Sequence, residues 1–152
     1  MRVTLQRVSG AEVRVGGEVV GSIGPGYLLL VGFRTGDGLP QIEWMSNKIL
    51  GLRVFLDDDG KMNRSVEEVG GDILVVSQFT LCAETKKGRR PSFVKTAKPE
   101  LGEKFYNSFI QGFKERGVSV ATGIFGAMMH VQLVNDGPVT FVLDSKISLM
   151  SG

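Results

Sequence analysis

The sequence predicts one α/β domain of three layers, because two strands that are apolar on both faces accompany two amphipathic helices. Residues 26–33 (GYLLLVGF) and 72–79 (DILVVSQF) are continuous apolar runs, the pattern of central strands that are covered on both sides. A length of 152 residues is typical of one domain, so we expect one domain over residues 1–152. The 21 glycines indicate many tight turns between short strands.

Composition and charge narrow the class of protein. The chain is 42% hydrophobic, which is typical of a folded globular chain, and its formal net charge of +2 is too small to indicate a nucleic-acid partner unless the positive residues cluster. The single Cys82 excludes an internal disulfide and fits a reducing compartment. The start of the sequence lacks the apolar region of a secretory signal, and no apolar run approaches the ~20 residues that span a bilayer. We therefore expect a cytoplasmic protein with no membrane partner.

Short strands are predicted at both ends of the chain. Alternating apolar residues indicate one strand at residues 3–5 and another at residues 11–15. The pair Gly16 and Gly17 then predicts a tight hairpin into a third strand. Strand-like runs recur in the last part of the chain at residues 118–122, 129–135 and 139–144.

Two helices are expected, each with a proline near its start and a glycine near its end. The first has its boundaries and apolar face at Pro40, Ile42, Met45, Ile49 and Gly51. The second has them at Pro99, Leu101, Phe105, Phe109, Phe113 and Gly117. Both apolar faces are predicted to belong to the core.

Several residues that could carry chemistry are better explained as structural. The acidic run at residues 57–60 (DDDG) has no matching ligand cluster and is interpreted as a solvated turn, so we expect no metal and no cofactor. His130 has no Asp or Ser beside it in the sequence, and a lone cysteine such as Cys82 is usually a small buried residue. Both are expected to be structural.

The most informative polar group follows the second central run. In SQFTL, the residues Ser77, Gln78 and Thr80 place three neutral polar side chains where an apolar strand ends. At the end of a central strand such groups meet a crevice, and they suit recognition of an ester or a ribose. Backbone N–H groups there could stabilise an oxyanion. The alternative is a strand end whose hydroxyl groups bond to the nearby backbone.

Positive charge is concentrated in residues 85–98 (TKKGRRPSFVKTAK), which contain no acidic residue. The cations are Lys86, Lys87, Arg89, Arg90, Lys95 and Lys98. They could hold a phosphate backbone, with Phe93 stacked on a base, or they could form a solvated basic loop.

The segment NDGPVT (135–140) places Gly137 and Pro138 between two strand-like runs. A turn followed by Pro138 as the first residue of the last strand is one explanation. A cis Gly-Pro bond that fixes the direction of two carbonyl groups is the other.

The motifs VVSQFTL, KGRRPSF, TGIFGA and NDGPVT resemble those of D-aminoacyl-tRNA deacylases in order and spacing. The resemblance extends over nearly the whole chain. It implies a three-layer α/β fold in which helices pack on two β layers of mixed and antiparallel strands, arranged like a barrel. It also implies a homodimer with active sites at the interface. The activity it implies is hydrolysis of the ester between a D-amino acid and the terminal adenosine of tRNA, or of glycine mischarged on tRNA-Ala.

The same resemblance assigns roles to residues. It implies that Ser77, Gln78 and Thr80 form the polar wall around the ester, with Thr80 as the residue considered for a nucleophile. It implies that Gly137 and Pro138 are joined by a cis bond and reach into the partner subunit's pocket, where they exclude L side chains. The residues it places near the adenosine and the tRNA end are Phe125, Met129, Arg89, Arg90, Lys86 and Lys87. The alternative function is a nucleic-acid-binding module without turnover that uses residues 85–98.

Overall fold

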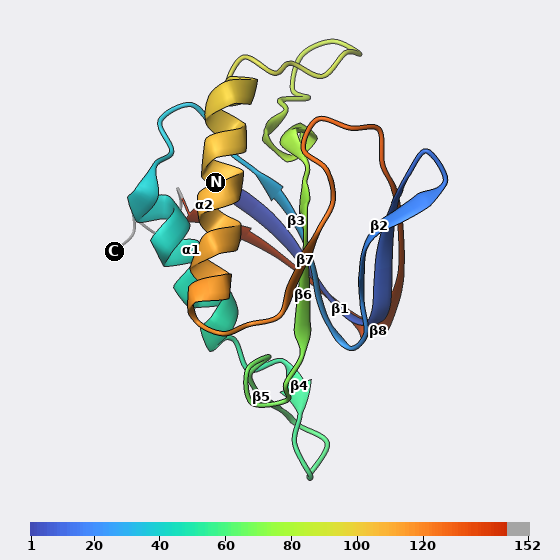
Figure 1. Ribbon diagram of the computed structural model, residues 1–152. Coiled ribbons are helices and arrows are strands. Elements are labelled where there is room, and N and C mark those ends of the chain that lie inside the picture. The colour runs from blue at the N-terminus through green and yellow to red at the C-terminus, as the bar shows by residue number, and fades with distance from the viewer. Residues whose placement is uncertain (146–152) are drawn as a thin grey trace.

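A six-stranded mixed sheet, curved toward a barrel, carries two helices on one side (Figure 1). The computed structural model describes residues 1–145. The strands are β1 (Arg2–Val15), β2 (Glu18–Ile23), β3 (Gly26–Gly32), β4 (Phe55–Leu56), β5 (Met62–Arg64), β6 (Asp72–Ser77), β7 (Val120–Thr122) and β8 (His130–Asp144). The helices are α1 (Leu39–Gly51), the short 3-10 helix η1 (Phe79–Cys82) and α2 (Pro99–Glu115).

The order of the strands closes the sheet on itself. The order is β2-β1-β3-β6-β7, and β8 also pairs with β1. The pairs β3–β6 and β6–β7 are parallel, whereas β1 pairs antiparallel with β2, β3 and β8. The two ends of this order meet at Gly21 of β2, where an added Cβ would collide with the backbone carbonyl of Thr122 in β7. The result is a nearly closed barrel, as the resemblance implied.

The prediction of two separate strands at the start of the chain is wrong, because residues 2–15 form the single strand β1. Val3 and Leu5 belong to the core beside the helices, whereas Val8 and Val13 belong to the core inside the barrel. The strand continues from one core to the other without interruption, because β8 pairs with it from Arg2 to Arg14. The predicted hairpin is confirmed, since Val15 pairs with Glu18 across Gly16 and Gly17.

The prediction of two strands at residues 129–135 and 139–144 is also wrong, because β8 is continuous. Its register against β1 shifts from Val8↔Asn135 to Gln6↔Thr140, so residues 136–139 bulge out opposite Arg7. Pro138 lies in this bulge and does not begin a strand. The Gly137–Pro138 bond is cis.

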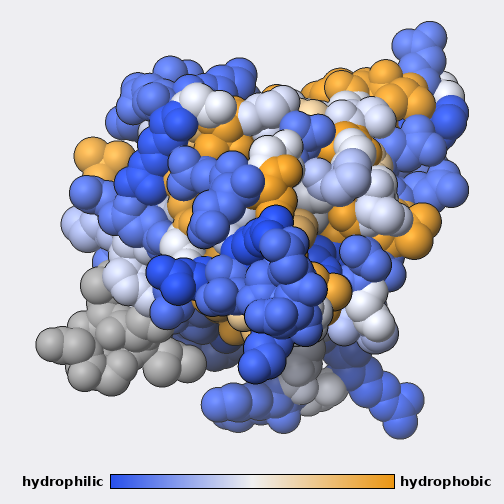
Figure 2. Space-filling model, turned by 90° about the horizontal axis from the view of Figure 1, so that it is seen from below, coloured by the Kyte–Doolittle hydropathy of each residue, from blue (hydrophilic) through white to orange (hydrophobic). Residues whose placement is uncertain are grey.

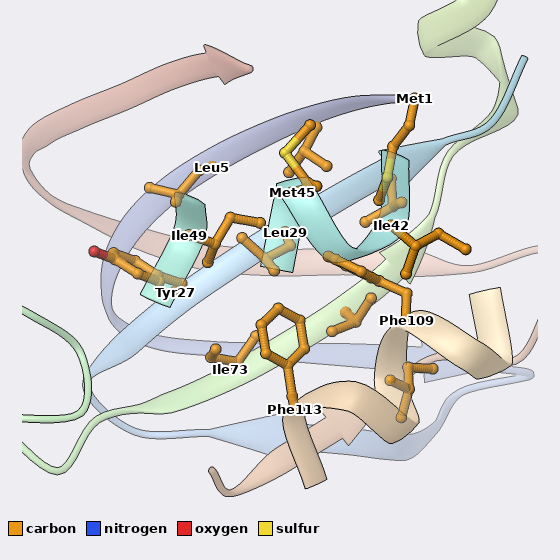
Figure 3. Packing of buried hydrophobic residues seen from close by; sticks show 14 of the residues in the cluster. Met1, Leu5, Tyr27, Leu29, Ile42, Met45, Ile49, Ile73, Phe109 and Phe113 are labelled. Carbon is orange, nitrogen blue, oxygen red and sulfur yellow. The ribbon is translucent and has the colours of Figure 1, made fainter. Parts of the chain in front are cut away.

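Two hydrophobic cores lie on the two faces of β3 and β6, which confirms the central strands. On one face, Tyr27 and Ile73 pack toward the helices (Figure 3). On the other, Leu28 and Leu74 pack inside the barrel. Alternate residues of both strands are therefore buried in different cores, which explains their continuous apolar sequence.

Helices α1 and α2 lie side by side over the first of these cores (Figure 1). The predicted core residues of α1 are buried, as are three of the four in α2. Leu101 was expected in the core but its side chain is 41% exposed. The buried face of α2 instead begins at Gly102 and includes Tyr106 and Ile110, because these three residues form a second i, i+4 row beside that of Phe105 and Phe109.

The short hairpin of β4 and β5 projects from the end of the molecule opposite η1 (Figure 1). Its turn is the acidic run at residues 57–60, and the carboxylate of Asp57 accepts hydrogen bonds from the backbone N–H groups of Asp59 and Lys61. Figure 2 views this end of the molecule and shows a mainly hydrophilic surface with hydrophobic residues between. Within residues 1–145, no helix is both long enough and apolar enough to cross a bilayer.

Candidate functional site

A cavity of about 900 Å³ opens at the carboxyl end of β6, between this strand, the start of α2 and the segment that follows β7. Its walls are mainly apolar, with a few polar groups at the end of β6, a composition typical of small-molecule sites. The lining residues that bear on its chemistry are Ser77, Gln78, Phe79, Phe93, Lys98, Phe125 and Met129.

Ser77 and Gln78 reach the cavity because β6 ends there. Both side chains are half-buried, and both residues line the cavity. The backbone N–H of Gln78 donates to Val31 O at 2.8 Å, so the chain stays attached to β3 for one residue beyond the strand. The crevice predicted from the sequence is therefore present at the end of this central strand.

Thr80 lies in η1, directly after the cavity wall. Its side chain is exposed and does not line the cavity, but the amide Nε2 of Gln78 donates a hydrogen bond to Thr80 Oγ1. This bond joins Thr80 to the polar wall. It also directs a proton at the hydroxyl oxygen, which does not help that oxygen act as a nucleophile.

Phe125 and Met129 both line the cavity, Phe125 beside α2 and Met129 against the core inside the barrel. The ring of Phe125 packs against Tyr106, with ring centroids 5.8 Å apart. The hydroxyl of Tyr106 donates to Val75 O in β6 at 2.7 Å. Burial raises the pKa of Tyr106 to about 12, so this donor keeps its proton at neutral pH. One buried tyrosine thus fixes both the aromatic wall and the strand that carries Ser77.

The basic loop, residues 85–91, lies at the rim of the site, since Phe93 just after it lines the cavity. Backbone hydrogen bonds in both directions between Glu84 and Ser92, each 2.8 Å, close its base. The cations at its exposed tip are Lys86, Lys87, Arg89 and Arg90. None of these four residues lines the cavity.

The sequence did not single out three contributors to the cavity wall as pocket residues. Phe33 lies at the end of β3, Phe79 opens η1 and Lys98 precedes α2. Among the described residues that line the cavity, Lys98 alone has an ionisable side chain. Pro99 marks the start of α2 and so places Lys98 at the junction of a loop and a helix N-terminus. Ligands often bind at such junctions.

The alternative nucleophiles do not line the cavity. Cys82 is the buried last residue of η1, and burial raises the pKa of its thiol, which confirms it as a small core residue. His130 is exposed at the first residue of β8, across from Arg14.

Gly137 and Pro138 lie on the exposed surface of the β8 bulge, which polar side chains hold in place. The buried guanidinium of Arg7 donates from Nε to Asp136 O at 2.9 Å and from Nη1 to Val54 O. The amide of Asn135 accepts from Val139 N at 2.7 Å and donates to Val139 O at 3.1 Å, which closes the bulge from the other side. Gly137 has a φ of +146°, and an added Cβ would lie 2.7 Å from Val139 Cγ2, so glycine alone fits.

Within one chain, this bulge does not meet the cavity. It lies opposite Arg7, which pairs with Tyr27 of β3, and Tyr27 pairs with Ile73 of β6. Ile73 lies about 13 Å along β6 from Ser77, and three strand spacings of about 4.8 Å separate β8 from β6. Of the predicted site residues, the structure brings together those at the end of β6 with Phe125 and Met129, and leaves the Gly-Pro pair apart.

Comparisons with known proteins agree with each other over nearly the whole chain. The family model described as D-Tyr-tRNA(Tyr) deacylase matches residues 4–144. A D-aminoacyl-tRNA deacylase of Desulfatibacillum aliphaticivorans is 53% identical over 146 residues, covering 96% of this chain and all of that protein. One from Exiguobacterium sp. (strain ATCC BAA-1283 / AT1b) is 55% identical, covering 96% of this chain and 99% of its own length. A solved structure named c-Myc DNA Unwinding Element Binding Protein superposes with a TM-score of 0.90 at 43% identity, covering 95% of this chain and 98% of that one.

Proposed function

Since the chain belongs to the D-aminoacyl-tRNA deacylase family, we propose that it hydrolyses the ester of D-aminoacyl-tRNA and releases free D-amino acid and tRNA. Glycine mischarged on tRNA-Ala is a further substrate of the same reaction. The observation that carries the proposal is the cavity at the end of β6, where the neutral polar groups of Ser77 and Gln78 face apolar walls. Its volume of about 900 Å³ suits a nucleoside with an attached amino acid.

The reaction is driven by orientation and by stabilisation of the oxyanion. Lys98 is the one ionisable group on the described cavity wall, and no carboxylate or imidazole of that wall can serve as a base. The 2′-hydroxyl of the terminal ribose assists the attacking water in place of a protein base. The N–H groups of Phe79 and Thr80 open η1, and the first N–H groups of a helix have no acceptor within it, so they are the donors for the oxyanion.

In this mechanism Thr80 positions the ester and is not the nucleophile. Its oxygen accepts a hydrogen bond from Gln78, which supports a fixed orientation of the hydroxyl. A D-tyrosyl-tRNA whose terminal ribose lacks the 2′-hydroxyl tests this, because its turnover should fall sharply. Unchanged turnover would return Thr80 to the role of nucleophile.

Selection of D over L substrates is by exclusion, with Gly137 and Pro138 of a second copy of the chain facing the cavity. The separation of the bulge from the cavity within one chain supports a site completed across a homodimer. The exposure of the pair, and its fixation by Arg7 and Asn135, support a rigid wall that is presented outward. A wall of backbone makes no favourable contact with a D side chain and collides with an L one.

The test is a deacylation time course on D-tyrosyl-tRNA beside L-tyrosyl-tRNA. The proposal predicts release of D-tyrosine and preservation of the L ester. Release of both amino acids at equal rates would contradict selection by handedness. Release of neither, with retained tRNA binding, would favour the non-catalytic nucleic-acid-binding module based on residues 85–98.

A further inference from the structure

Two phenylalanine side chains form an exposed aromatic pair at the mouth of the cavity. Phe79 is 54% exposed and Phe93 is 40% exposed, and their ring centroids lie 5.1 Å apart with the planes tilted by 59°. Both residues also line the cavity. Each ring therefore touches the other and the cavity, while much of its surface remains open to a ligand that leaves the cavity.

The basic loop connects these two rings. Phe79 lies before the loop and Phe93 directly follows Ser92, the residue that closes its base. Lys95 is paired with Glu84 at 2.7 Å, so a cation near the base is already neutralised. Between the two rings in sequence, the tip of the loop carries four exposed cations, Lys86, Lys87, Arg89 and Arg90. An aromatic surface beside a cluster of cations is the combination that binds single-stranded nucleic acid, through base stacking and phosphate contacts.

We propose that Phe79 and Phe93 stack a base of the unpaired nucleotides that precede the terminal adenosine, and that the loop cations contact their phosphates. The inference rests on the proposed function, since it takes the terminal adenosine to be inside the cavity. The strand of RNA must then leave through the mouth, where the aromatic pair lies. Stacking tolerates any base, so the surface binds the acceptor end common to all tRNAs.

The test compares two substrates that differ in these nucleotides. D-tyrosyl-tRNA has them, and 3′-O-D-tyrosyl-adenosine lacks them. Phe93→Ala should lower kcat/KM on the tRNA by about fivefold or more. On the adenosine ester the loss should be smaller by about that factor, because only the contribution of Phe93 to the cavity wall is then removed. Phe93→Tyr should retain the wild-type values, and the control Val94→Ala, at a side chain that is 84% exposed, should change neither.

The outcomes separate this inference from the proposed function. Equal losses on both substrates would show that Phe93 acts only as a cavity wall, and no loss on either would remove its role, so both would overturn the inference. If the wild-type protein hydrolyses neither substrate, the proposed function fails first.

The charged part of the surface has its own test. Arg89→Gln together with Arg90→Gln should make the decline of log kcat/KM with log salt concentration shallower, by about 0.7 for each phosphate that the loop no longer neutralises. The matched control is Lys61→Gln, an exposed cation in the β4–β5 turn. An unchanged salt dependence in the double variant would overturn the role of the loop.

Discussion

At the scale of single residues, two polar side chains constrain the bulge that carries Gly137 and Pro138. Arg7 is buried, and its guanidinium donates to two backbone carbonyls, one before the pair and one in the segment before β4. A buried guanidinium is costly unless its donors are used, so its place here is tied to the carbonyls that it holds. Asn135 holds the other end of the bulge with two hydrogen bonds to Val139.

Asn135→Ala should relax the selection of D over L substrates. The variant loses both hydrogen bonds to Val139, of about 1 kcal/mol each, and the one to Thr140, so the bulge gains mobility and the ratio of D to L deacylation should fall about tenfold or more. Initial rates on D- and L-tyrosyl-tRNA measure this ratio. Thr140→Val is the matched control, because it removes a neighbouring acceptor of Asn135 but leaves both bonds to Val139. An undiminished ratio in Asn135→Ala would show that the bulge does not sort substrates.

At the scale of elements, the proposed mechanism depends on the placement of η1, which carries Thr80 and the proposed oxyanion donors. It packs directly on the backbone of Gly32, and Arg2 Nη1 donates to Leu81 O at 2.8 Å. Arg2 is held in turn by Asp144, which also accepts two hydrogen bonds from Arg34. The 3-10 helix is therefore held by β1, β3 and the end of β8 together.

Gly32→Ala should damage catalysis more than stability. An added Cβ would lie 2.9 Å from Gln78 O and 3.2 Å from Leu81 Cβ, so η1 must move. Small displacements of a catalytic element are costly, and we expect kcat on D-tyrosyl-tRNA to fall by about tenfold to a hundredfold. Gly51→Ala in α1 is the control, because its Cβ would meet nothing within 4 Å. Wild-type kcat in Gly32→Ala would mean that the position of η1 does not limit the reaction.

At the scale of the whole molecule, helix α2 and the barrel are joined by contacts at the cavity wall. Tyr106 is the clearest link, since its hydroxyl bonds to β6 and its ring supports Phe125. Its pKa is raised to about 12, above the ordinary value of about 10, because burial disfavours the ionised form. The folded state thus holds this proton more tightly than the unfolded chain does. Its contribution to stability is complete below pH 10 and is lost as the pH rises toward 12.

Tyr106→Phe should therefore have an effect on stability that depends on pH. Urea unfolding at pH 8 should show the wild-type protein more stable by about 1 kcal/mol, the value of one hydrogen bond. Between pH 10 and 12 this advantage should disappear, while contributions from the other tyrosine and from the lysines cancel in the comparison. An equal difference at pH 8 and pH 11.5 would mean that Tyr106 does not titrate as described.

The sequence predicts much of this architecture, because local patterns carry it. Apolar runs identified β3 and β6 as central, and Pro40 and Pro99 marked the starts of both helices. The continuity of β1 and β8 was missed because strand length is decided by long-range pairing, which alternation within a short window does not report. The two strands pair with each other on both sides of each register shift, so both remain continuous.

For the same reason, the sequence predicts some parts of the candidate site and not others. Ser77 and Gln78 follow from the end of an apolar strand, which is a local signal. The contact of Phe79 with Phe93 depends on how the intervening loop closes, and the burial of Arg7 depends on carbonyls far away in the sequence. From the sequence, Arg7 is expected to be exposed, because arginine is seldom buried. Only the tertiary structure shows that it is buried.

We propose that each site combines the cavity of one chain with the Gly-Pro pair of another, and a mixed dimer of two variants distinguishes this arrangement from a site within one chain. One chain carries Pro138→Ala and an intact cavity; the other carries Ser77→Ala, Gln78→Ala and Thr80→Ala with an intact Gly-Pro pair. The first alone should hydrolyse both D- and L-tyrosyl-tRNA, and the second alone should hydrolyse neither. Assembled together, they should retain D-tyrosyl-tRNA deacylation and lose L-tyrosyl-tRNA deacylation, since the second chain supplies the missing wall. A mixed dimer that still cleaves both esters in the ratio of the first chain alone would contradict a site completed across two chains.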